Sequence, residues 1–359
     1  MNDANPVCYS STMIDLDAVR TALRRDTRFA GIARAQLRPL ASHGVGHDHV
    51  RVDGAAIEGR PIVLRVPRLS QWRLPAAEAL EYQAAGFARL SASGHAPRCF
   101  GTLPPSDELP RGALIVEFID GAKPTLPRDM RRIAECLARI HLLPVPLAAQ
   151  RAPLLSHDDA VEGTLRAIDE QMSYLPQLDL APESRLLLRR AQEWARRLTP
   201  DGLPPPVTTL CGTDTHPGNY LIDARGRAVF VDGEKALFGN PAADIAHASN
   251  PPSTLWDADI GTVLEADAVR AFFDAYFDCV GAALAARVRP WLPIMRRLIA
   301  LRTVTWGVRW RVLSGRGDGG MAEWSAERLP AGLRGHMERI TQAWLEPKSL
   351  QMSLSPALD

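Results

Sequence analysis

The segment from Leu210 to Asp244 constrains this chain more than any other, because it brings acidic and amide side chains to one short hairpin. It reads LCGTDTHPGNYLIDARGRAVFVDGEKALFGNPAAD. Two β-prone runs, 220–222 and 228–231, are separated by a polar turn that contains Gly226. This spacing predicts an antiparallel hairpin, and the glycines and proline ahead of it predict a loop rather than a helix.

The hairpin suggests a binding site for one hard cation. If the turn is centred on Arg225 and Gly226, antiparallel pairing places Asn219 opposite Asp232. Directly opposed residues have Cβ atoms roughly 4.5–5.5 Å apart, and Mg²⁺ prefers oxygen ligands from one or two carboxylates together with substrate phosphates. Asp214 precedes Asn219 in the predicted loop, so we expect it beside the metal without binding it.

This arrangement resembles the kinase active site, in which a catalytic-loop Asp accepts the substrate hydroxyl proton while a later Asn and a downstream Asp hold Mg²⁺. More closely, the segment resembles the aminoglycoside phosphotransferase and choline kinase superfamily. There a His-Gly-Asp-x-His-x-x-Asn loop precedes a hairpin that ends in Asp-x-Glu or Asp-x-Asp, and a Gly-x-Pro-x-x-Asp segment follows. The matching positions here are Asp214, His216, Asn219, Asp232, Glu234, Gly239, Pro241 and Asp244.

The chain departs from this pattern at Gly212-Thr213, where the family usually has His-Gly. That histidine is generally scaffolding in the family, so its absence bears on loop geometry more than on chemistry. For the neighbouring residues the sequence favours structural roles. His216 is interpreted as a packed loop histidine, Asp244 as a helix cap that in the family also braces the catalytic loop, and Lys235 as a solvated charge.

The resemblance implies that the N-terminal third supplies an ATP-binding half. Three strand-like runs, AQLRPL, HVRVDG and PIVLRVPR, lie between residues 36 and 68. Gly44 and Gly46 fall in the turn between the first two, where backbone N–H groups could cover phosphates; a plain hairpin turn is the alternative. Arg65 stands where kinases carry the Lys that pairs with the α- and β-phosphates, and arginine keeps the charge and can bind phosphate bidentately.

A helix predicted over 74–91 contains Glu78 and Glu81, either of which could pair with Arg65 as the corresponding kinase Glu does. We favour Glu81, because of its spacing from a Pro-Arg segment that resembles the family; a solvated helix face is the alternative. The apolar run that follows predicts a buried strand. By resemblance it leads into a hinge at which Glu117 and Ile119 contact adenine through backbone groups.

The predicted fold is α+β and bilobal, like that of protein kinases, with a small antiparallel-sheet N-lobe and a larger, mainly helical C-lobe. We expect a flexible N-terminus over 1–15 and a nucleotide-binding N-lobe over 16–121, with the hinge at about 117–121. The C-lobe, with the catalytic loop and acceptor site, is expected over 122–346 and a flexible tail over 347–359. Helical patterns in the C-lobe run over 130–144, 158–175, 183–198, 267–288 and 291–313.

Composition is compatible with this fold. The length of 359 residues favours two domains. The formal charge of +1 gives no global field for nucleic acid or an anionic membrane, and we expect neither as a partner. The five cysteines are scattered without metal-type spacing, which predicts reduced thiols in the cytoplasm. Neither a signal peptide nor a membrane span is indicated, and the sequence leaves the oligomeric state open.

Together these features predict a Mg²⁺- and ATP-dependent small-molecule kinase, with GTP as the alternative donor. Asp214 is expected to be the base or orienter, Asn219 and Asp232 the metal ligands, and Arg65 the phosphate clamp. The missing loop histidine and the arginine at 65 favour the alternative of a nucleotide-binding pseudokinase, but the retained Asp, Asn and Asp argue against it.

The acceptor is not fixed by the sequence, since superfamily acceptors range from aminoglycosides and other antibiotics to choline, ethanolamine, thiamine, sugars and homoserine. An acidic segment includes Asp257 and Asp259 beside Trp256, which suggests a cationic acceptor. Trp256, Trp306 and Trp310 could add cation–π contacts, and Glu234 is a further candidate for acceptor binding. A solvated acidic face and a buried tryptophan core are the alternatives.

Overall fold

The structure is a computed structural model that describes residues 14–41, 44, 46–68, 70, 72–159, 161–314 and 331–355. These residues form two compact units. The first comprises residues 14–84, 99–118, 314 and 331–338, and the second comprises 85–98, 119–313 and 339–355. One of the points at which the chain passes from the first unit to the second lies between Phe118 and Ile119, within the segment in which the sequence suggests a hinge.

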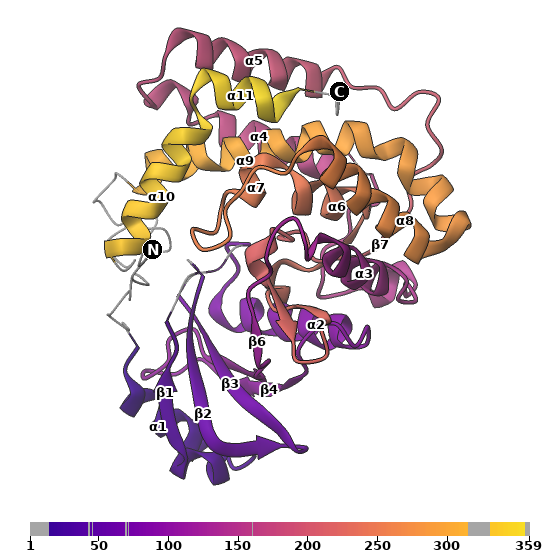
Figure 1. Ribbon diagram of the computed structural model, residues 1–359. Helices are drawn as coiled ribbons and strands as arrows, with labels where there is room; N and C mark the ends of the chain where they lie inside the picture. Colours follow the sequence, from indigo (N-terminus) through magenta and orange to yellow (C-terminus); the bar gives the residue numbers. More distant parts are fainter. Residues whose placement is uncertain are drawn as a thin grey trace, which may run out of the picture. The chain divides into compact units, whose positions relative to one another are not determined.

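The first unit is built on a five-stranded antiparallel sheet with the strand order β1-β2-β3-β5-β4. Figure 1 draws these strands as arrows, and they carry the β-branched and apolar runs that the sequence predicts. Helix α1 begins at an N-cap, Asp15, whose carboxylate accepts backbone N–H groups of Asp17 and Ala18. The bounds are α1 Leu16–Arg25, η1 Ala30–Arg34, β1 Gln36–Pro39, β2 His47–Ile57, β3 Arg60–Pro67, β4 Cys99–Leu103 and β5 Ala113–Glu117.

Side chains alternate between the two faces of this sheet. One face is the hydrophobic core, in which Ile62 and Leu64 of β3 pack with Val19 and Leu23 of α1. Arg65 lies one residue further along β3, on the opposite face, and pairs across the strands with His49 of β2 and Leu114 of β5. Because side chains alternate along β3, Arg65 lies on the sheet face opposite the one that packs against α1.

The second unit is mainly helical, with two small antiparallel sheets, β10-β7 and β6-β8-β9. Its helices follow the predicted amphipathic patterns, with α3 burying Ile133, Leu137 and Ile140. The strands are β6 Gly121–Ala122, β7 Thr209–Cys211, β8 Tyr220–Asp223, β9 Ala228–Phe230 and β10 Leu237–Gly239. The helices are α3 Met130–His141, η2 Ala148–Gln150, α4 Glu162–Met172, η3 Leu175–Gln177, α5 Pro182–Arg196, η4 Pro217–Asn219, η5 Gly233–Lys235, α6 Ala242–Ser249, α7 Pro251–Thr254, α8 Ala266–Val288, η6 Arg289–Trp291, α9 Leu292–Ser314 and α11 Pro347–Leu354.

Two further helices have residues in both units, α2 over Ala76–Ser91 and α10 over Ala331–Trp344. The predicted helix over 74–91 is thus present. The tail differs from the expectation of a flexible segment, because residues 347–354 form α11. Leu350 and Leu354 of this helix are buried, and Gln351 donates a hydrogen bond to Glu183 at the start of α5. The apolar face of α11 packs against α5, and burial of these side chains explains why the tail is ordered.

The predicted hairpin is present as β8 and β9, but its register is shifted by one residue from the prediction. Tyr220 pairs with Phe230 and Ile222 with Ala228, so Asn219 lies opposite Val231 rather than Asp232. The reason is the turn, which holds three residues between Asp223 and Arg227 and places Gly226 at φ 75°. A three-residue hairpin loop of this kind closes with a left-handed glycine, and this requirement decides the register.

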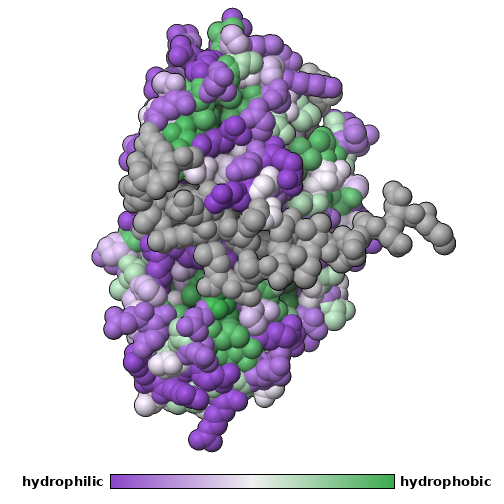
Figure 2. Space-filling model, turned by 90° about the vertical axis from the view of Figure 1, so that its left-hand side faces the viewer, coloured by the Kyte–Doolittle hydropathy of each residue, from purple (hydrophilic) through white to green (hydrophobic). Residues whose placement is uncertain are grey.

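The surface of the molecule is mixed in character. On the face drawn in Figure 2, hydrophobic residues gather in separate patches between hydrophilic ones. Within the described parts of the chain, helices with the length and apolar character needed to cross a membrane are absent.

Candidate active site

The catalytic loop predicted around Asp214 is fixed at both of its ends. It leaves β7, which pairs with β10 so that Cys211 lies opposite Leu237. It then passes through the 3-10 turn η4 into β8. The amide nitrogen of Asn219 donates to the backbone oxygen of Asp214 at 2.7 Å, which closes the loop on itself. Two short sheets and one internal hydrogen bond therefore hold the loop.

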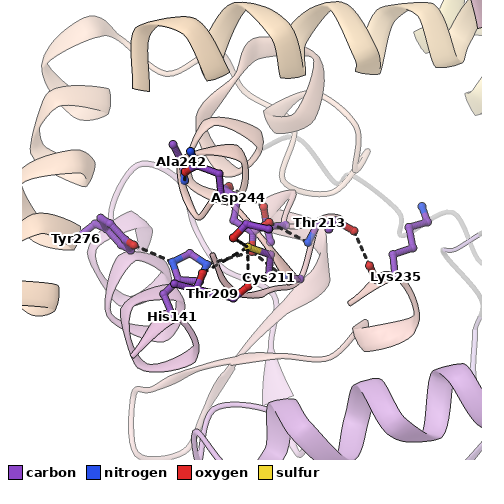
Figure 3. A network of polar contacts seen from close by, with 12 residues as sticks. His141, Thr209, Cys211, Thr213, Lys235, Ala242, Asp244 and Tyr276 are labelled. Atoms are coloured by element: carbon purple, nitrogen blue, oxygen red, sulfur yellow. Dashed lines mark hydrogen bonds and ion pairs between the residues drawn. The ribbon is translucent and has the colours of Figure 1, made fainter. Parts of the chain in front are cut away.

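Asp244 braces the start of this loop (Figure 3). Its carboxylate accepts the backbone N–H groups of Gly212 at 2.6 Å and Thr213 at 2.9 Å. The same carboxylate contacts His141 Nε2 at 3.2 Å, and His141 Nδ1 lies 2.8 Å from the hydroxyl of Tyr276. The predicted cap role of Asp244 is wrong, because its oxygens bind the loop rather than the first N–H groups of α6; the brace implied by resemblance is present.

Cys211 lies close enough to His141 and Asp244 for the three to form a possible metal site. Burial raises the pKa of the Cys211 thiol well above its ordinary value, so the sulfur stays protonated and is a poor ligand. The oxygens of Asp244 are already used by the loop. The cluster is therefore a structural brace, and both ring nitrogens of His141 have polar partners in the core.

The Gly212-Thr213 pair has a local structural explanation. A Cβ atom at Gly212 would lie 2.8 Å from the Phe230 ring and 3.1 Å from the Thr215 methyl group, so this backbone leaves no room for a side chain there. Thr213 adopts φ 60°, and Asp214 N donates across it to Gly212 O at 2.8 Å. Such a tight turn is strained for a β-branched residue. The Thr213 hydroxyl donates to the backbone oxygen of Lys235 at 2.8 Å.

Asp214 forms an ion pair that the sequence interpretation missed. Lys235 Nζ lies 2.6 Å from Asp214 Oδ2, so Lys235 is not the solvated charge we expected. Burial would raise the pKa of Asp214, but several charged contacts, of which the Lys235 ammonium is the largest, together hold this pKa well below its ordinary value. Burial likewise opposes the charge on Lys235, but Asp214 raises the pKa of the lysine overall. Both side chains are therefore charged at neutral pH.

Two histidines beside the loop are neutral. Burial is the main cause that lowers the pKa of His216 and, more strongly, that of His247. Their ring centroids are 6.3 Å apart, and His216 also lies 6.1 Å from the Trp256 ring. His216 is thus a packed loop histidine, as the sequence suggests.

Asp257 and Asp259, proposed from the sequence as attractors for a cation, already share one. Lys123 Nζ lies 2.8 Å from Asp257 and 2.7 Å from Asp259. Burial opposes the charge on Lys123, but the two carboxylates raise its pKa overall. Sequence reasoning could not find this partner because Lys123 lies far from both residues in the chain.

Of the tryptophans proposed as cation–π contacts, Trp256 and Trp306 lie in one aromatic group, whereas Trp310 is a core residue. Trp256 stacks on Trp344 with ring centroids 5.5 Å apart and meets Trp306 edge to face at 5.5 Å. Trp310 is buried in the core, only 2% exposed, so it cannot contact an acceptor in this conformation. The aromatic group next to the catalytic loop therefore consists of Trp256, Trp306 and Trp344.

In the first unit, Arg65 is 5% exposed and lies among histidines. Its guanidinium is 3.4 Å from His47 Nδ1, and His47 Nε2 is 2.9 Å from the Gln83 side-chain oxygen. Burial, followed by the charge of Arg65, lowers the pKa of His49 to about 3. Burial, followed by the charge of Arg65, also holds the pKa of His47 well below its ordinary value, so both histidines are neutral beside the arginine.

The expected ion pair between Glu81 and Arg65 is not present among the described residues. Glu81 is exposed, as is Glu78, whereas Gln83 is buried and points to the sheet through His47. Residues 79, 80, 82 and 83 form the buried side of α2, so the helix rotation places Glu81 in solvent. A helical wheel of this segment could have shown that 83 shares the apolar face and 81 does not.

The remaining predicted nucleotide contacts lie at turns and at a strand end. Gly44 and Gly46 lie between β1 and β2, and their backbone oxygens accept hydrogen bonds from Arg68 at 3.1 and 2.8 Å; Ser42, His43 and Val45 are outside the described residues. Glu117 ends β5 and forms an ion pair with Arg60 at 2.5 Å. Ile119 is the half-buried first residue of the second unit after β5.

Arg302 also contacts the predicted catalytic loop, which sequence reasoning missed. It comes from α9, and its guanidinium donates to the backbone oxygen of Thr213 at 3.1 Å. Burial lowers its pKa, while the charges of Asp214 and Asp244 act in the opposite direction. A single arginine in a long helix carries no motif, so only the tertiary structure could place it at the loop.

The sheet, the helical unit and the braced Asp-Asn-Asp hairpin define a kinase-like phosphotransferase. A family model described as the phosphotransferase enzyme family matches residues 37–291, and the chain belongs to that family. It is therefore an enzyme that transfers a phosphoryl group to a small-molecule hydroxyl. The predicted α+β, protein-kinase-like fold is confirmed.

Solved structures share this fold at low sequence identity. A choline/ethanolamine kinase family protein from Mesorhizobium loti is 19% identical with a TM-score of 0.57, over 94% of this chain and 98% of that one. A macrolide 2'-phosphotransferase from Brachybacterium faecium is 18% identical with a TM-score of 0.54, over 93% and 98%. A choline kinase from Cryptosporidium parvum is 14% identical with a TM-score of 0.57, over 94% and 96%. A comparison with curated proteins gave no match.

Proposed function

We propose that this enzyme transfers the γ-phosphoryl group of ATP to a hydroxyl group of a small molecule, with GTP as the alternative donor. The observation that carries the proposal is Asp214, an ionised carboxylate at the centre of a loop held by Asp244 and closed by Asn219. Similar folds have been solved with AMP-PNP and hygromycin B in one case and with GDP in another, which supports a nucleoside triphosphate as donor.

In this reaction Asp214 binds and orients the acceptor hydroxyl group. The acceptor oxygen forms a bond to the γ-phosphorus, the bond from that phosphorus to the bridging oxygen breaks, and the diphosphate leaves with the electron pair. The acceptor proton passes to Asp214 as the new bond forms. Arg65, the backbone of Gly44 and Gly46, and the hinge residues Glu117 and Ile119 are proposed as nucleotide contacts.

Asn219 and Asp232 are proposed as ligands of Mg²⁺. The donor set fits this ion, because the amide nitrogen of Asn219 is used by Asp214 O and its side-chain oxygen remains as the ligand atom. Asp232 follows β9 by two residues and acts electrostatically on both His216 and Lys235, so its carboxylate belongs to the same site. When bound, Mg²⁺ neutralises phosphate charge and fixes phosphate orientation.

The acceptor is proposed to be a small alcohol of the kind that aminoglycoside phosphotransferases or choline kinases use, with another antibiotic or a metabolite as the alternative. Asp257, Asp259 and Lys123 together carry one net negative charge, two carboxylates against one ammonium. A cationic acceptor is therefore attracted more weakly than the sequence suggested. A screen of cationic and neutral alcohols for ATP consumption separates these classes.

A cytoplasmic location is part of the proposal. It is supported by Cys99, Cys136, Cys211 and Cys279, which are free thiols. A pseudokinase is the competing proposal, and the braced catalytic loop argues against it.

The test of this function is the variant Asp214→Asn. We expect turnover to fall by on the order of 10²–10⁴, the usual contribution of a positioned proton acceptor. Nucleotide affinity should change little, because Asp214 binds the acceptor and not the donor. Phosphotransfer kinetics and calorimetry with Mg·ATP measure the two quantities. Phosphotransfer at the wild-type rate would remove Asp214 from the mechanism.

The metal assignment is tested by Asp232→Ala and Asn219→Ala. We expect Asp232→Ala to abolish the Mg²⁺ dependence of ATP binding, and Asn219→Ala to weaken it, because a carboxylate contributes a full charge and an amide only a dipole. Calorimetry with ATP, with and without Mg²⁺, gives the answer. If both variants keep the wild-type Mg²⁺ dependence, the ligands lie elsewhere.

A further inference from the structure

The sequence assigns no function to Lys235, although its ammonium group forms an ion pair with Asp214. Lys235 Nζ lies 2.6 Å from Asp214 Oδ2, and the two side chains are 23% and 21% exposed. An ammonium group has three N–H donors, and the contact with Asp214 is its one hydrogen bond to the described residues. Its position is half-buried but open to solvent, so the other donors can serve a ligand.

The catalytic loop contains no cation of its own. Between Asp214 and Asn219 the sequence is Thr-His-Pro-Gly, and burial keeps His216 neutral. Arg302 donates to the backbone oxygen of Thr213 rather than to Asp214. Among the described residues of the second unit, Lys235 is thus the basic side chain in hydrogen-bond contact with Asp214. Phosphoryl transfer develops negative charge on the transferred group, and a positive side chain at that group stabilises it.

Geometry limits how far Lys235 can lie from the reacting atoms. A base must come within about 2.6–3.2 Å of the hydroxyl oxygen whose proton it accepts. Because Lys235 Nζ is 2.6 Å from Asp214 Oδ2, it lies within about 6 Å of an acceptor oxygen bound to that same carboxylate oxygen. The attacked phosphorus lies about 3–3.5 Å from that oxygen, so the oxygens of the transferring group come within reach of a flexible lysine.

The backbone also holds Lys235 in place. Its carbonyl oxygen accepts the hydroxyl of Thr213 at 2.8 Å, the residue directly before Asp214. Thr213 adopts a left-handed conformation at φ 60°, in which a glycine would be less strained. The threonine provides a hydroxyl that glycine lacks, and with it a second link between the Lys235 segment and the catalytic loop. Strain of this kind is found where a site requires a fixed geometry.

We propose that Lys235 is a catalytic residue, whose ammonium binds the oxygens of the transferring phosphoryl group while Asp214 takes the acceptor proton. The inference rests on the proposed phosphotransfer function. As the acceptor oxygen bonds to the γ-phosphorus and the bond to the bridging oxygen breaks, Lys235 donates to the phosphoryl oxygens without losing its own proton. The proton of the acceptor goes to Asp214, and the electron pair leaves with the nucleoside diphosphate.

The experiment measures phosphate release from Mg·ATP by the full-length enzyme, with water as the acceptor. Lys235→Met keeps the length of the side chain and removes its charge, and we expect kcat to fall by on the order of 10²–10³ with little change in the KM for Mg·ATP. Lys235→Arg keeps the charge and should retain more of the activity. Lys348→Met is the matched control, because Lys348 is exposed on α11 and should leave the rate unchanged.

A background without the base separates catalysis from positioning. If Lys235 acted only by holding Asp214, Lys235→Met would cost nothing further in Asp214→Asn. We expect the double variant to be at least tenfold slower than Asp214→Asn alone. An equal rate of these two variants, or a wild-type rate for Lys235→Met, overturns the proposal while the proposed function stands. A wild-type rate for Asp214→Asn removes Asp214 from the mechanism of the proposed function. If Lys235→Met does not fold, Lys235→Gln replaces it in the same comparison.

Discussion

At the scale of single residues, Thr213 shows how one departure from a family pattern changes a loop. A β-branched residue at φ 60° costs on the order of 1–2 kcal/mol relative to glycine. The hydroxyl bond to Lys235 recovers about 0.5–1.5 kcal/mol of this. The cost of the strained conformation and the gain from the hydrogen bond nearly cancel. Thr213 is therefore tolerated, and its hydroxyl group links the Lys235 segment to the catalytic loop.

This cancellation can be tested with Thr213→Val and Thr213→Gly. Valine keeps the strain and removes the hydroxyl, so we expect the free energy of unfolding to fall by about 1 kcal/mol. Glycine removes both the strain and the hydroxyl, and its stability should be close to that of the wild type and above that of the valine variant. Urea denaturation measures the order. A valine variant more stable than the glycine variant would show that Thr213 is not strained.

A second departure from the family pattern, the glycine at position 212, depends on the packing of Phe230. The ring of Phe230 fills the space in which a side chain at 212 would begin. A histidine at this position, as in the family pattern, would need a different backbone or a smaller residue at 230. The missing histidine is therefore matched by packing and does not by itself indicate a lost function.

At the scale of elements, the brace between α6 and the catalytic loop depends on the carboxylate of Asp244. This side chain is fully buried and accepts two backbone N–H groups together with His141. The helices α3 and α8 complete the brace through His141 and Tyr276. Helix α6, the catalytic loop and α3 thus meet at one carboxylate, and α8 supports His141 from behind through Tyr276.

Asp244→Ala should destabilise the protein strongly. It leaves the N–H groups of Gly212 and Thr213 buried without their acceptor, and loss of a buried charged partner typically costs about 3–5 kcal/mol. Asp267→Ala is the control, since Asp267 in the first turn of α8 is 93% exposed in its side chain and should stay within about 0.5 kcal/mol of the wild type. Equal denaturation midpoints for the two variants would contradict the brace.

At the scale of the whole molecule, several buried histidines should make the stability depend on pH. His49 has an ordinary pKa of 6.5 that is lowered to about 3 in the folded protein, mainly by burial and then by Arg65. Between these values the unfolded chain binds a proton that the folded protein does not. Stability contributed by the neutral ring is therefore complete above pH 6.5 and is lost as the pH falls from 6.5 toward 3.

We expect this loss to reach up to about 1.4 kcal/mol per pH unit for one such group. Urea denaturation at pH 7.5 and 5 measures it in the wild type and in His49→Gln. Glutamine cannot be protonated, so the variant should lose less stability between these two values. The same loss in both proteins would mean that His49 does not cause the pH dependence.

Some features of this protein could be predicted from local sequence patterns, whereas others depend on tertiary packing. Asp214, Asn219 and Asp232 could be proposed from the sequence, because their types and spacing along one loop and hairpin are those of the chemistry we propose. The amphipathic helix with Ile133 and Leu137, and the strand with Arg65, followed from periodicity alone. These features are local, and local patterns depend on backbone geometry that neighbouring residues determine.

The sequence by itself thus determined the class of fold, the catalytic loop and the family. Only the tertiary structure decided the partners of the charges: Lys235 on Asp214, and Lys123 on Asp257 and Asp259. It also decided the hairpin register, through one glycine in the turn. The physical reason is that an ion pair between distant residues depends on how whole elements pack, and no spacing within a single segment encodes that packing.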